Sequence, residues 1–339
     1  MKNKIFVAGN IIVDFLYPIT GYPERGQLTT ITDIGKSVGG AVCNTGIDLK
    51  KLLPGTEVAA LGIVGNDDSG DYAVNMMSAS GIDCSLVKRE GATSFTAVMS
   101  DEHSRERTFF QYRGANALFS ENSFDWDDID GSILHAAYIL LLDALDEEDA
   151  EYGTKMARLL AHAKERGIRT SIDVVSEAGE RFTKLVPPAL RYTDICCINE
   201  IEASRTTGIA IRDGDGNLIY RNIKPLLRAL FGLGVGEWAI IHCPEGGFGM
   251  DKDGRFAQCG QIRTPEGFIK GKVGAGDAFC AGVLAAAHLG RSLDYAMLLG
   301  NAAATQSLAE PGATEAMRTV EEVMAMAEEF GITPLPEAE

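Results

Sequence analysis

The sequence lacks the cysteine spacing and the cationic surplus that mark several large classes of protein. Its seven cysteines form no C-x-x-C pair, so neither a zinc site nor a disulfide framework is indicated. Lys and Arg number 31 against 48 Asp and Glu, a net charge of −17. Because nucleic acids and anionic membranes are bound mainly through clustered cations, we expect neither as a partner.

Long hydrophobic runs are missing as well. The first apolar run, residues 5–8, is interrupted by Gly9, Asn10 and Asp14 before it is long enough for a signal peptide or a membrane span. We therefore expect a cytoplasmic protein. The 339 residues are 45% hydrophobic and 23% charged, which is typical of a globular chain and excludes disordered and fibrous classes.

What the chain does contain is an alternation of short apolar runs with segments of helical period. This pattern predicts a parallel sheet covered by helices. The expected strands are residues 4–8, 57–63, 138–142, 170–174, 195–198 and 238–242. The expected helices are residues 41–53, 71–80, 147–166, 224–233, 278–289, 292–307 and 317–330. No internal repeat or linker interrupts them, so one domain over residues 1–339 is expected.

Two segments, residues 11–38 and 93–118, do not follow that alternation. They are rich in Thr, Ile, Phe and Tyr and alternate with the period of strands, so we expect a few antiparallel strands inserted into the α/β body. Such a small sheet can cover the crevice at the carboxyl ends of the main strands and exclude water from it. The alternative is a set of edge strands that extends the main sheet.

The most informative motif, Gly274-Ala-Gly-Asp277, stands where a long apolar helix begins. Its small residues let backbone N–H groups approach an anion at the positive end of the helix dipole. Asp277, beside such an anion, can accept a proton from a hydroxyl that attacks a phosphate. The alternative is an ordinary N-cap, because Gly-Asp often precedes a helix.

A second glycine pair, Gly39-Gly40, opens another helix with Asn44 one turn in. The glycines let backbone come close to a ligand, and Asn44 offers both a donor and an acceptor. Asp14, just past the first strand, can accept two hydrogen bonds from the hydroxyls of a polyol. An exposed loop Asp and a phosphate site at the glycines are the alternatives.

A third motif, Asn199 with Glu202, follows the apolar run 195–198. The pair suits metal-bound phosphates reached through the waters of Mg²⁺, which dehydrates reluctantly. A helix cap with acidic residues in its first turn is the alternative. For His242, in a strand that runs into a glycine turn, we expect a packed side chain, because no nucleophile is recognisable beside it.

In order and separation, these three motifs resemble those of the ribokinase (PfkB-type) carbohydrate kinases, and the resemblance covers almost the whole chain. It implies a three-layer αβα sandwich with a mainly parallel central sheet and a small β-sheet lid. It also implies ATP-dependent phosphorylation of a hydroxyl, most simply a primary hydroxyl of a monosaccharide. By the same resemblance Asp277 is the general base, and Gly274, Ala275 and Gly276 form the anion hole.

The resemblance also assigns residues to the two substrates. The sugar side comprises Asp14, Gly39, Gly40, Asn44, Arg113, Asn116 and Asp143. The nucleotide side comprises Asn199, Gly247, Lys272, Asn301 and Gly312, with Asn199 and Glu202 reaching Mg²⁺ through water. A homodimer through paired lids is a further expectation from the family.

The chain departs from the family before the anion hole. Relatives usually have Asp-Thr where this chain has Gly271-Lys272, and that Asp helps many of them to hold a monovalent cation. A need for potassium is therefore open, and we hypothesise that the Lys272 ammonium replaces the cation's charge or contacts the ATP phosphates. Ribokinases proper also differ at Ile12 and Ala41, so a kinase for another sugar is favoured.

Two other functions stay open. One is a nucleoside kinase of the same fold, and the other is a non-catalytic regulator that binds a sugar or a nucleotide. A dinucleotide oxidoreductase fits poorly, because no G-x-G-x-x-G turn follows the first strand. Cys43 and Cys280 lie inside glycine-rich motifs and are candidates for reactive thiols.

Overall fold

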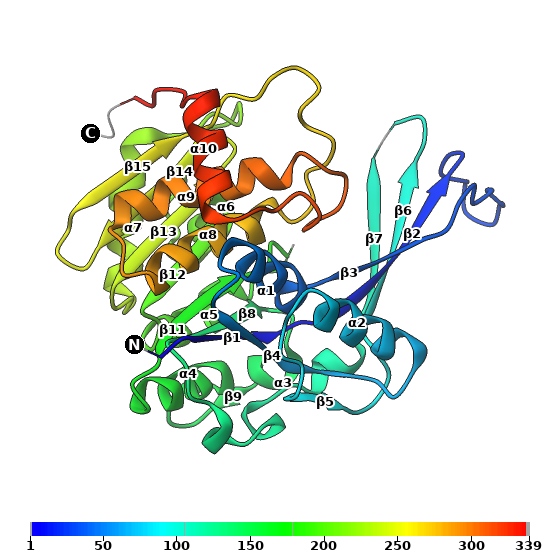
Figure 1. Cartoon of the computed structure of the whole chain (residues 1–339), viewed down its shortest axis with the longest axis horizontal. Helices are drawn as coiled ribbons and strands as arrows, with labels where there is room; N and C mark the ends of the chain where they lie inside the picture. The colour runs from blue at the N-terminus through cyan, green and yellow to red at the C-terminus, as the bar shows by residue number, and fades with distance from the viewer. Residues whose placement is uncertain (1, 105, 178, 337–339) are drawn as a thin grey trace.

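The computed structural model describes residues 2–104, 106–177 and 179–336. Its main sheet consists of β1 (Lys4–Gly9), β4 (Glu57–Val64), β5 (Val87–Arg89), β8 (Ile133–Ile139), β11 (Arg169–Val174), β12 (Ile195–Asn199), β13 (Trp238–Cys243), β14 (Gly246–Asp251) and β15 (Phe256–Gly260). The nine strands lie in the order β15-β14-β13-β12-β11-β8-β1-β4-β5 (Figure 1). The pairs β13–β14 and β14–β15 are antiparallel and the other described pairs of this sheet are parallel, so the expected mainly parallel sheet is confirmed.

Helices cover both faces of this sheet. One layer contains α1 (Ala41–Leu52), α2 (Asp68–Ala79), α8 (Ala275–His288), α9 (Leu293–Ser307) and α10 (Val320–Phe330). The other contains α3 (Asp143–Asp146), α4 (Lys155–Glu165), α5 (Phe182–Leu190), α6 (Glu200–Thr207) and α7 (Ile223–Gly232). Short 3₁₀ helices are η1 (Gly114–Leu118), η2 (Glu121–Ser123), η3 (Trp126–Asp128) and η4 (Tyr220–Asn222). The expected three-layer sandwich is thereby confirmed.

Strand alternation divides the core between these layers. In β1, Ile5 and Val7 pack with the helices of one layer, whereas Phe6 and Ala8 pack with those of the other. This follows from the period of two in a strand, which sends successive side chains to opposite faces. Within the described ranges, no helix has both the length and the apolar character needed to cross a bilayer.

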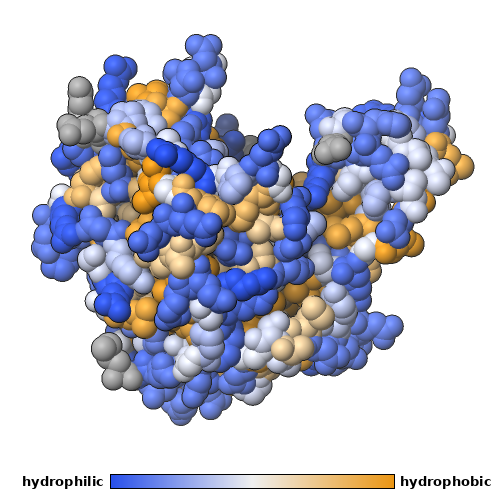
Figure 2. Space-filling model, turned by 45° about the horizontal axis from the view of Figure 1, so that its top comes forward, coloured by the Kyte–Doolittle hydropathy of each residue, from blue (hydrophilic) through white to orange (hydrophobic). Residues whose placement is uncertain are grey.

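A second sheet stands apart from the body. It consists of β2 (Ile12–Ile19), β3 (Gly35–Gly39), β6 (Phe95–Asp101) and β7 (Arg107–Tyr112), in the order β3-β2-β6-β7. Figure 2 shows a hollow between this sheet and the α/β body. The sheet is separate and does not extend the main one, which removes the edge-strand alternative. It is also not wholly antiparallel as expected, because β2 and β6 pair in parallel.

The strand expected over residues 138–142 was placed too late in the chain. β8 runs from Ile133 to Ile139 and pairs with β1 on one side and β11 on the other. His135 and the two alanines that follow it are not typical strand residues. They are buried nevertheless, because β8 lies between β1 and β11. The apolar residues 140–142 belong to the buried loop at the strand's carboxyl end.

The helix expected over residues 147–166 is shorter than its periodicity suggested. A small hairpin of β9 (Glu148–Asp149) and β10 (Gly153–Thr154) precedes it. Gly153 has a φ of 91°, which suits glycine and not a helix. The Thr154 side chain then accepts a hydrogen bond from the Ala157 N–H, so the cap, not the apolar pattern, fixes the start of α4.

Candidate active site

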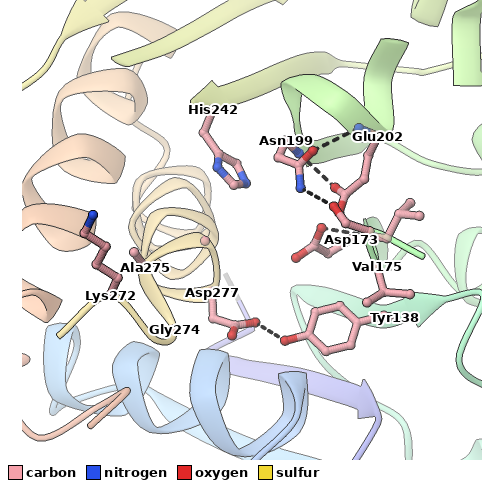
Figure 3. Close-up of a pocket in the computed structure, with 13 residues that line it drawn as sticks. Tyr138, Asp173, Val175, Asn199, Glu202, His242, Lys272, Gly274, Ala275 and Asp277 are labelled. Atoms are coloured by element: carbon pink, nitrogen blue, oxygen red, sulfur yellow. Dashed lines mark hydrogen bonds between the residues drawn. The ribbon is translucent and has the colours of Figure 1, made fainter. Parts of the chain in front are cut away.

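A pocket of about 230 Å³ opens at the carboxyl ends of the central strands. Because the ends of parallel strands meet at one edge of a sheet, residues far apart in sequence come together there. The end of β8, the end of β11 with the segment after it, the end of β12 and β13 form one side, and the N-terminus of α8 forms the other (Figure 3). The lining residues are Tyr138, Asp173, Val174, Val175, Ser176, Asn199, Glu202, His242, Lys272, Gly274, Ala275, Gly276 and Asp277.

The start of α8 presents unpaired backbone donors to this pocket. Gly274 is the N-cap residue, with a φ of 77° and no side-chain cap. A Cβ there would lie 2.6 Å from the Cβ of Ala313, so the turn admits only glycine. The N–H groups of Ala275, Gly276 and Asp277 have no acceptor among the described residues. Together with the helix dipole, they make this turn suited to an anion.

Asp277 is held at both carboxylate oxygens. Oδ1 accepts a hydrogen bond from the Tyr138 hydroxyl over 2.5 Å and one from the Thr45 hydroxyl over 3.4 Å. Oδ2 accepts from Asn44 Nδ2 over 3.0 Å. Burial raises the pKa of Asp277, and the three hydrogen bonds act in the opposite direction. The result is an oriented carboxylate beside the anion-binding turn.

Two further carboxylates line the opposite wall, Asp173 and Glu202. Glu202 accepts hydrogen bonds from the Asn199 N–H over 2.9 Å and from the Ser176 hydroxyl over 2.8 Å. Burial raises its pKa to about 7. Burial, and then the neighbouring Glu202, raise the pKa of Asp173 well above its ordinary value. The sequence drew attention to Glu202 and Asn199 but not to Asp173.

Asn199 and Glu202 also form the helix cap that was the alternative interpretation. Asn199 Oδ1 accepts hydrogen bonds from the N–H groups of Ile201 and Glu202, and Glu202 Oε2 accepts one from the Asn199 N–H. The cap holds both side chains at the pocket wall, where both line the cavity. Capping and ligand binding are therefore not exclusive for this pair.

Lys272 and His242 complete the lining. Lys272 is the one cationic side chain among the lining residues, and it forms no ion pair or hydrogen bond with any residue that the structure describes. The His242 ring packs on Phe279 with the ring centroids 5.0 Å apart. Burial lowers the pKa of His242 to about 4, so the ring is neutral and packed.

The expected sugar-side residues lie where β2, β3 and α1 meet. A Cβ on Gly39 would lie 2.3 Å from Asp14 Oδ2, so the glycine leaves room for that carboxylate. Gly40 caps α1 with a φ of 83°, and a Cβ there would meet the Asn10 carbonyl oxygen at 2.5 Å. Burial raises the pKa of Asp14, although the Thr96 side chain donates to it.

Arg113 and Asp143 are brought together, whereas Asn116 is buried and bonded to Ile11. Arg113 Nη1 lies 3.4 Å from Asp143 Oδ1 and donates to the Leu140 carbonyl oxygen. Asn116 is 1% exposed and bonds both the N–H and the carbonyl of Ile11. The Asn116 amide joins η1 to the loop before β2, and its contact with substrate stays a prediction.

Three residues expected on the nucleotide side lie outside the pocket lining. Asn301 Nδ2 donates to the carbonyl oxygens of Cys259 and Met297. A Cβ on Gly247 would lie 2.7 Å from the Phe279 ring and 3.0 Å from Asn301 Nδ2, so these residues pack beneath the site. Gly312 lies against the Glu315 carboxylate, which a Cβ would meet at 2.1 Å.

The candidate reactive thiols are buried. Cys43 and Cys280 are both 0% exposed. Burial raises the pKa of Cys43, and a hydrogen bond with Cys197 together with burial raises that of Cys280. Because the thiolate is the reactive form, neither meets the requirement for a nucleophile.

Three residues of the site escaped the sequence interpretation: Tyr138 and Asp173, which line the pocket, and Thr45, which donates to Asp277. Tyr138 was placed at the start of a strand, although it stands near the end of β8, where ligand-binding side chains gather. Thr45 directly follows Asn44 in the same helical turn, and Asp173 stands in β11 among apolar neighbours. A carboxylate near the carboxyl end of an expected strand was the signal that could have identified Asp173.

A helix start with unpaired N–H groups, beside an oriented carboxylate and across a hollow from a separate small sheet, is suited to phosphoryl transfer. The chain belongs to the pfkB family of carbohydrate kinases, whose model matches residues 2–320. It is accordingly a carbohydrate kinase, a phosphotransferase that uses ATP.

Known relatives agree with this assignment. The chain is 25% identical over 307 residues to the 5-dehydro-2-deoxygluconokinase of Shouchella clausii, covering 87% of each chain. The ribokinase of Arabidopsis thaliana complexed with ribose and ATP is similar in structure, with a TM-score of 0.79, 19% identity, and coverage of 97% of this chain and 99% of that one. The nucleoside kinase of Methanocaldococcus jannaschii gives a TM-score of 0.74 at 21% identity, covering 96% and 98%.

Proposed function

We propose that the protein transfers the γ-phosphoryl group of ATP to a primary hydroxyl of a monosaccharide or sugar derivative, with Asp277 as general base. One observation carries the proposal. The Asp277 carboxylate is fixed by Tyr138 and Asn44 beside the unpaired N–H groups at the start of α8. A hydroxyl placed there has a proton acceptor on one side and an anion-binding turn on the other.

The chain's own residues divide the remaining work. Lys272, which has no partner among the described residues, meets the phosphates of ATP and offsets part of their charge, since a charge-assisted hydrogen bond is stronger than a neutral one. Gly274 to Gly276 hold the transferring phosphoryl group. Asp14 and Asn44 hold the sugar, with Gly39 leaving the space that Asp14 occupies. Closure of the small sheet over the hollow excludes water and limits hydrolysis of ATP.

Mg²⁺ fits this site as a hydrated ion held mainly by the phosphates of ATP. Among the described residues, no cluster of three or more His, Cys, Asp or Glu side chains is placed to hold a metal. Both Glu202 oxygens already accept hydrogen bonds from the protein, which leaves them able to contact a metal's waters more readily than the metal itself. Asn199 and Glu202 would hold those waters. The ion, when bound, neutralises phosphate charge.

The acceptor is inferred from the polar groups around Asp277. Asp14 is an acceptor of hydroxyl hydrogen bonds and suits a polyol, and relatives include kinases named for 5-dehydro-2-deoxygluconate and for ribose. Arg113 and Asp143, at the junction of lid and body, are the charged groups available to a more distant part of the sugar.

A homodimer through the lid is part of the proposal. On β7, Phe109 and Phe110 are 62% and 56% exposed, and successive strand residues face opposite sides of the sheet. When the small sheet closes over the body, one of its faces can be covered, and a second copy of the chain can cover the other. Light scattering on purified protein tests this, with a monomer at all concentrations as the contradicting result.

We also infer a cytoplasmic location. All seven cysteines are free, as is usual for proteins of a reducing compartment. A carbohydrate kinase also needs access to ATP. Fractionation of the cells that express the protein tests the location.

The direct test of the function is release of ADP across a panel of sugars, sugar acids and nucleosides, with and without Mg²⁺. Turnover of a monosaccharide supports the proposal, and turnover of nucleosides alone identifies a nucleoside kinase. Measurable ATP binding without phosphotransfer to any acceptor would instead indicate a regulator. Asp294→Asn, at an exposed residue of α9 paired with Arg255, serves as the matched control for carboxylate substitutions in the site.

A further inference from the structure

Asp48 is a buried carboxylate that the proposed chemistry does not use. It lies on α1 and is 0% exposed. Neither of its oxygens has a hydrogen-bond donor among the described residues. Asn44 Oδ1, one helical turn earlier, is a second buried acceptor without a donor. Buried polar atoms without partners are rare and unfavourable, so two on one helix call for a common cause.

The two orphaned groups share one face of α1. Residues four apart on a helix lie one above the other, within reach of each other's side chains. Asn44 and Thr45 on this face hold Asp277 at the start of α8. Asp48 therefore lies behind the residues that orient the proposed base.

The orientation of the Asn44 amide is fixed by its partner. An ionised Asp277 only accepts hydrogen bonds, so the amide nitrogen of Asn44 must face it, as observed. That arrangement turns Asn44 Oδ1 away from Asp277. Because Oδ1 is shielded from solvent, its donor has to come from inside the protein.

We propose that Asp48 carries a proton and donates it in a hydrogen bond to Asn44 Oδ1, which makes Asp48 a positioning residue for Asp277. One proton then gives Asn44 Oδ1 and one Asp48 oxygen a hydrogen-bond partner, and only the second Asp48 oxygen stays without a donor from the described part of the chain. Two hydrogen bonds then connect Asp48 with Asp277: one from the Asp48 hydroxyl to Asn44 Oδ1, and one from Asn44 Nδ2 to Asp277 Oδ2. Because Asp277 is a base only in the proposed function, the catalytic part of this inference rests on that function.

The charges around Asp48 favour its neutral form. Burial, and then the negative charge of Asp277 on α8, raise the pKa of Asp48 well above its ordinary value. Glu315, in the loop before α10, acts in the same direction, and Lys51 on α1 acts against it. Lys51 is itself directed elsewhere, because its Nζ donates to the Thr314 carbonyl oxygen over 2.7 Å.

The protonation of Asp48 can be tested without catalysis, by denaturant unfolding of the wild type and of Asp48→Asn over a range of pH. A carboxyl group whose pKa is raised in the folded state stabilises the fold below its unfolded pKa of about 3.9. That contribution is lost as the pH rises toward the folded pKa. The wild-type unfolding constant should therefore gain up to about tenfold per pH unit relative to Asp48→Asn. Asp294→Asn should keep the wild-type dependence.

Equal pH dependence in the wild type and Asp48→Asn would overturn the proposal, because it would mean that Asp48 is ionised in the folded protein. The same holds if a monovalent cation stabilises the wild type but not Asp48→Asn, since a buried cation would then satisfy the three oxygens. Neither result bears on whether Asp277 is the base.

The positioning role is tested by steady-state kinetics of Asp48→Asn and Asp48→Leu. Asp48→Asn keeps a donor for Asn44 Oδ1 and should retain turnover within about threefold. Leu fills a similar volume without a donor and should lower turnover by about tenfold, with the KM for ATP unchanged. Asp48→Ala supplies the comparison if Leu prevents folding. Equal turnover in Asp48→Asn and in the two variants without a donor would show that Asp48 does not position Asp277.

Discussion

The Tyr138 hydroxyl donates a hydrogen bond to Asp277 Oδ1 over 2.5 Å, and this bond joins the carboxyl end of β8 to the first turn of α8. From α1, Asn44 holds the other carboxylate oxygen. The carboxylate therefore cannot rotate freely, and a hydroxyl that approaches meets it in one orientation. Such preorganisation is what proton transfer in a closed site requires.

Tyr138→Phe should move the acid limb of the rate profile to higher pH. The hydrogen bond from Tyr138 lowers the pKa of Asp277, so its loss leaves the base protonated up to a higher pH. We expect kcat/KM to fall by about tenfold on the acid side and less on the alkaline side. A profile shifted toward lower pH, or an equal loss at every pH, would contradict this role; Tyr152→Phe, remote from the pocket, is the control.

Lys272→Ala should lower kcat/KM for ATP by about ten- to a hundredfold, the range for losing a hydrogen bond to a charged group. Lys270→Ala is the matched control, because Lys270 pairs with Glu310 outside the pocket. In the wild type, the ammonium of Lys272 should make added potassium nearly without effect. Strong potassium stimulation of the wild type, combined with a silent Lys272→Ala, would refute the hypothesis that Lys272 supplies the missing cationic charge.

Gly39→Ala should weaken sugar binding and spare ATP. The new Cβ would lie 2.3 Å from Asp14 Oδ2, so the carboxylate has to move, and a carboxylate at the end of a side chain can do so without unfolding the chain. We expect the KM for sugar to rise by about tenfold with an unchanged KM for ATP. Gly55→Ala, at a glycine with open space around it, is the control, and an unchanged KM for sugar would remove Asp14 from the site.

Glu202→Gln should raise the Mg²⁺ concentration needed for half-maximal activity by about ten- to a hundredfold, the usual effect of losing an outer-shell partner of a metal. The reason is the loss of a carboxylate that can accept hydrogen bonds from metal-bound water. Magnesium titration at saturating sugar measures it, with Glu329→Gln on the exposed face of α10 as control. An unchanged magnesium requirement would leave Glu202 as a helix cap only.

The main sheet and most helices could be predicted because their signals are local. A short apolar run such as residues 195–198 reflects a strand buried on both faces, and a helical period such as that of residues 292–307 reflects a helix buried on one face. β14 has no such signal: its sequence Gly-Gly-Phe-Gly reads as a turn, and its pairing with β13 and β15 overrides that preference. The parallel pairing of β2 with β6 depends on contacts between distant segments, which no local pattern records.

The site divides in the same way. Asp277 and its glycines could be predicted because a helix start, small residues and one carboxylate are adjacent in the chain. Tyr138 and Asp173 were missed, because each owes its place to the edge of the sheet where β8 and β11 end. The two hydrogen bonds that join Asn116 to Ile11 could not be predicted either, because they connect segments far apart in the chain.

The most direct measurement of the central claim is single-turnover phosphotransfer by Asp277→Asn, with ATP binding measured on the same protein. Asn keeps the size of the side chain and an acceptor for Tyr138, but it is far too weak a base to take the hydroxyl proton. The account predicts unchanged ATP affinity and a rate lower by about two to four powers of ten, while Asp294→Asn stays at the wild-type rate. A near-normal rate in Asp277→Asn would show that another group removes the proton.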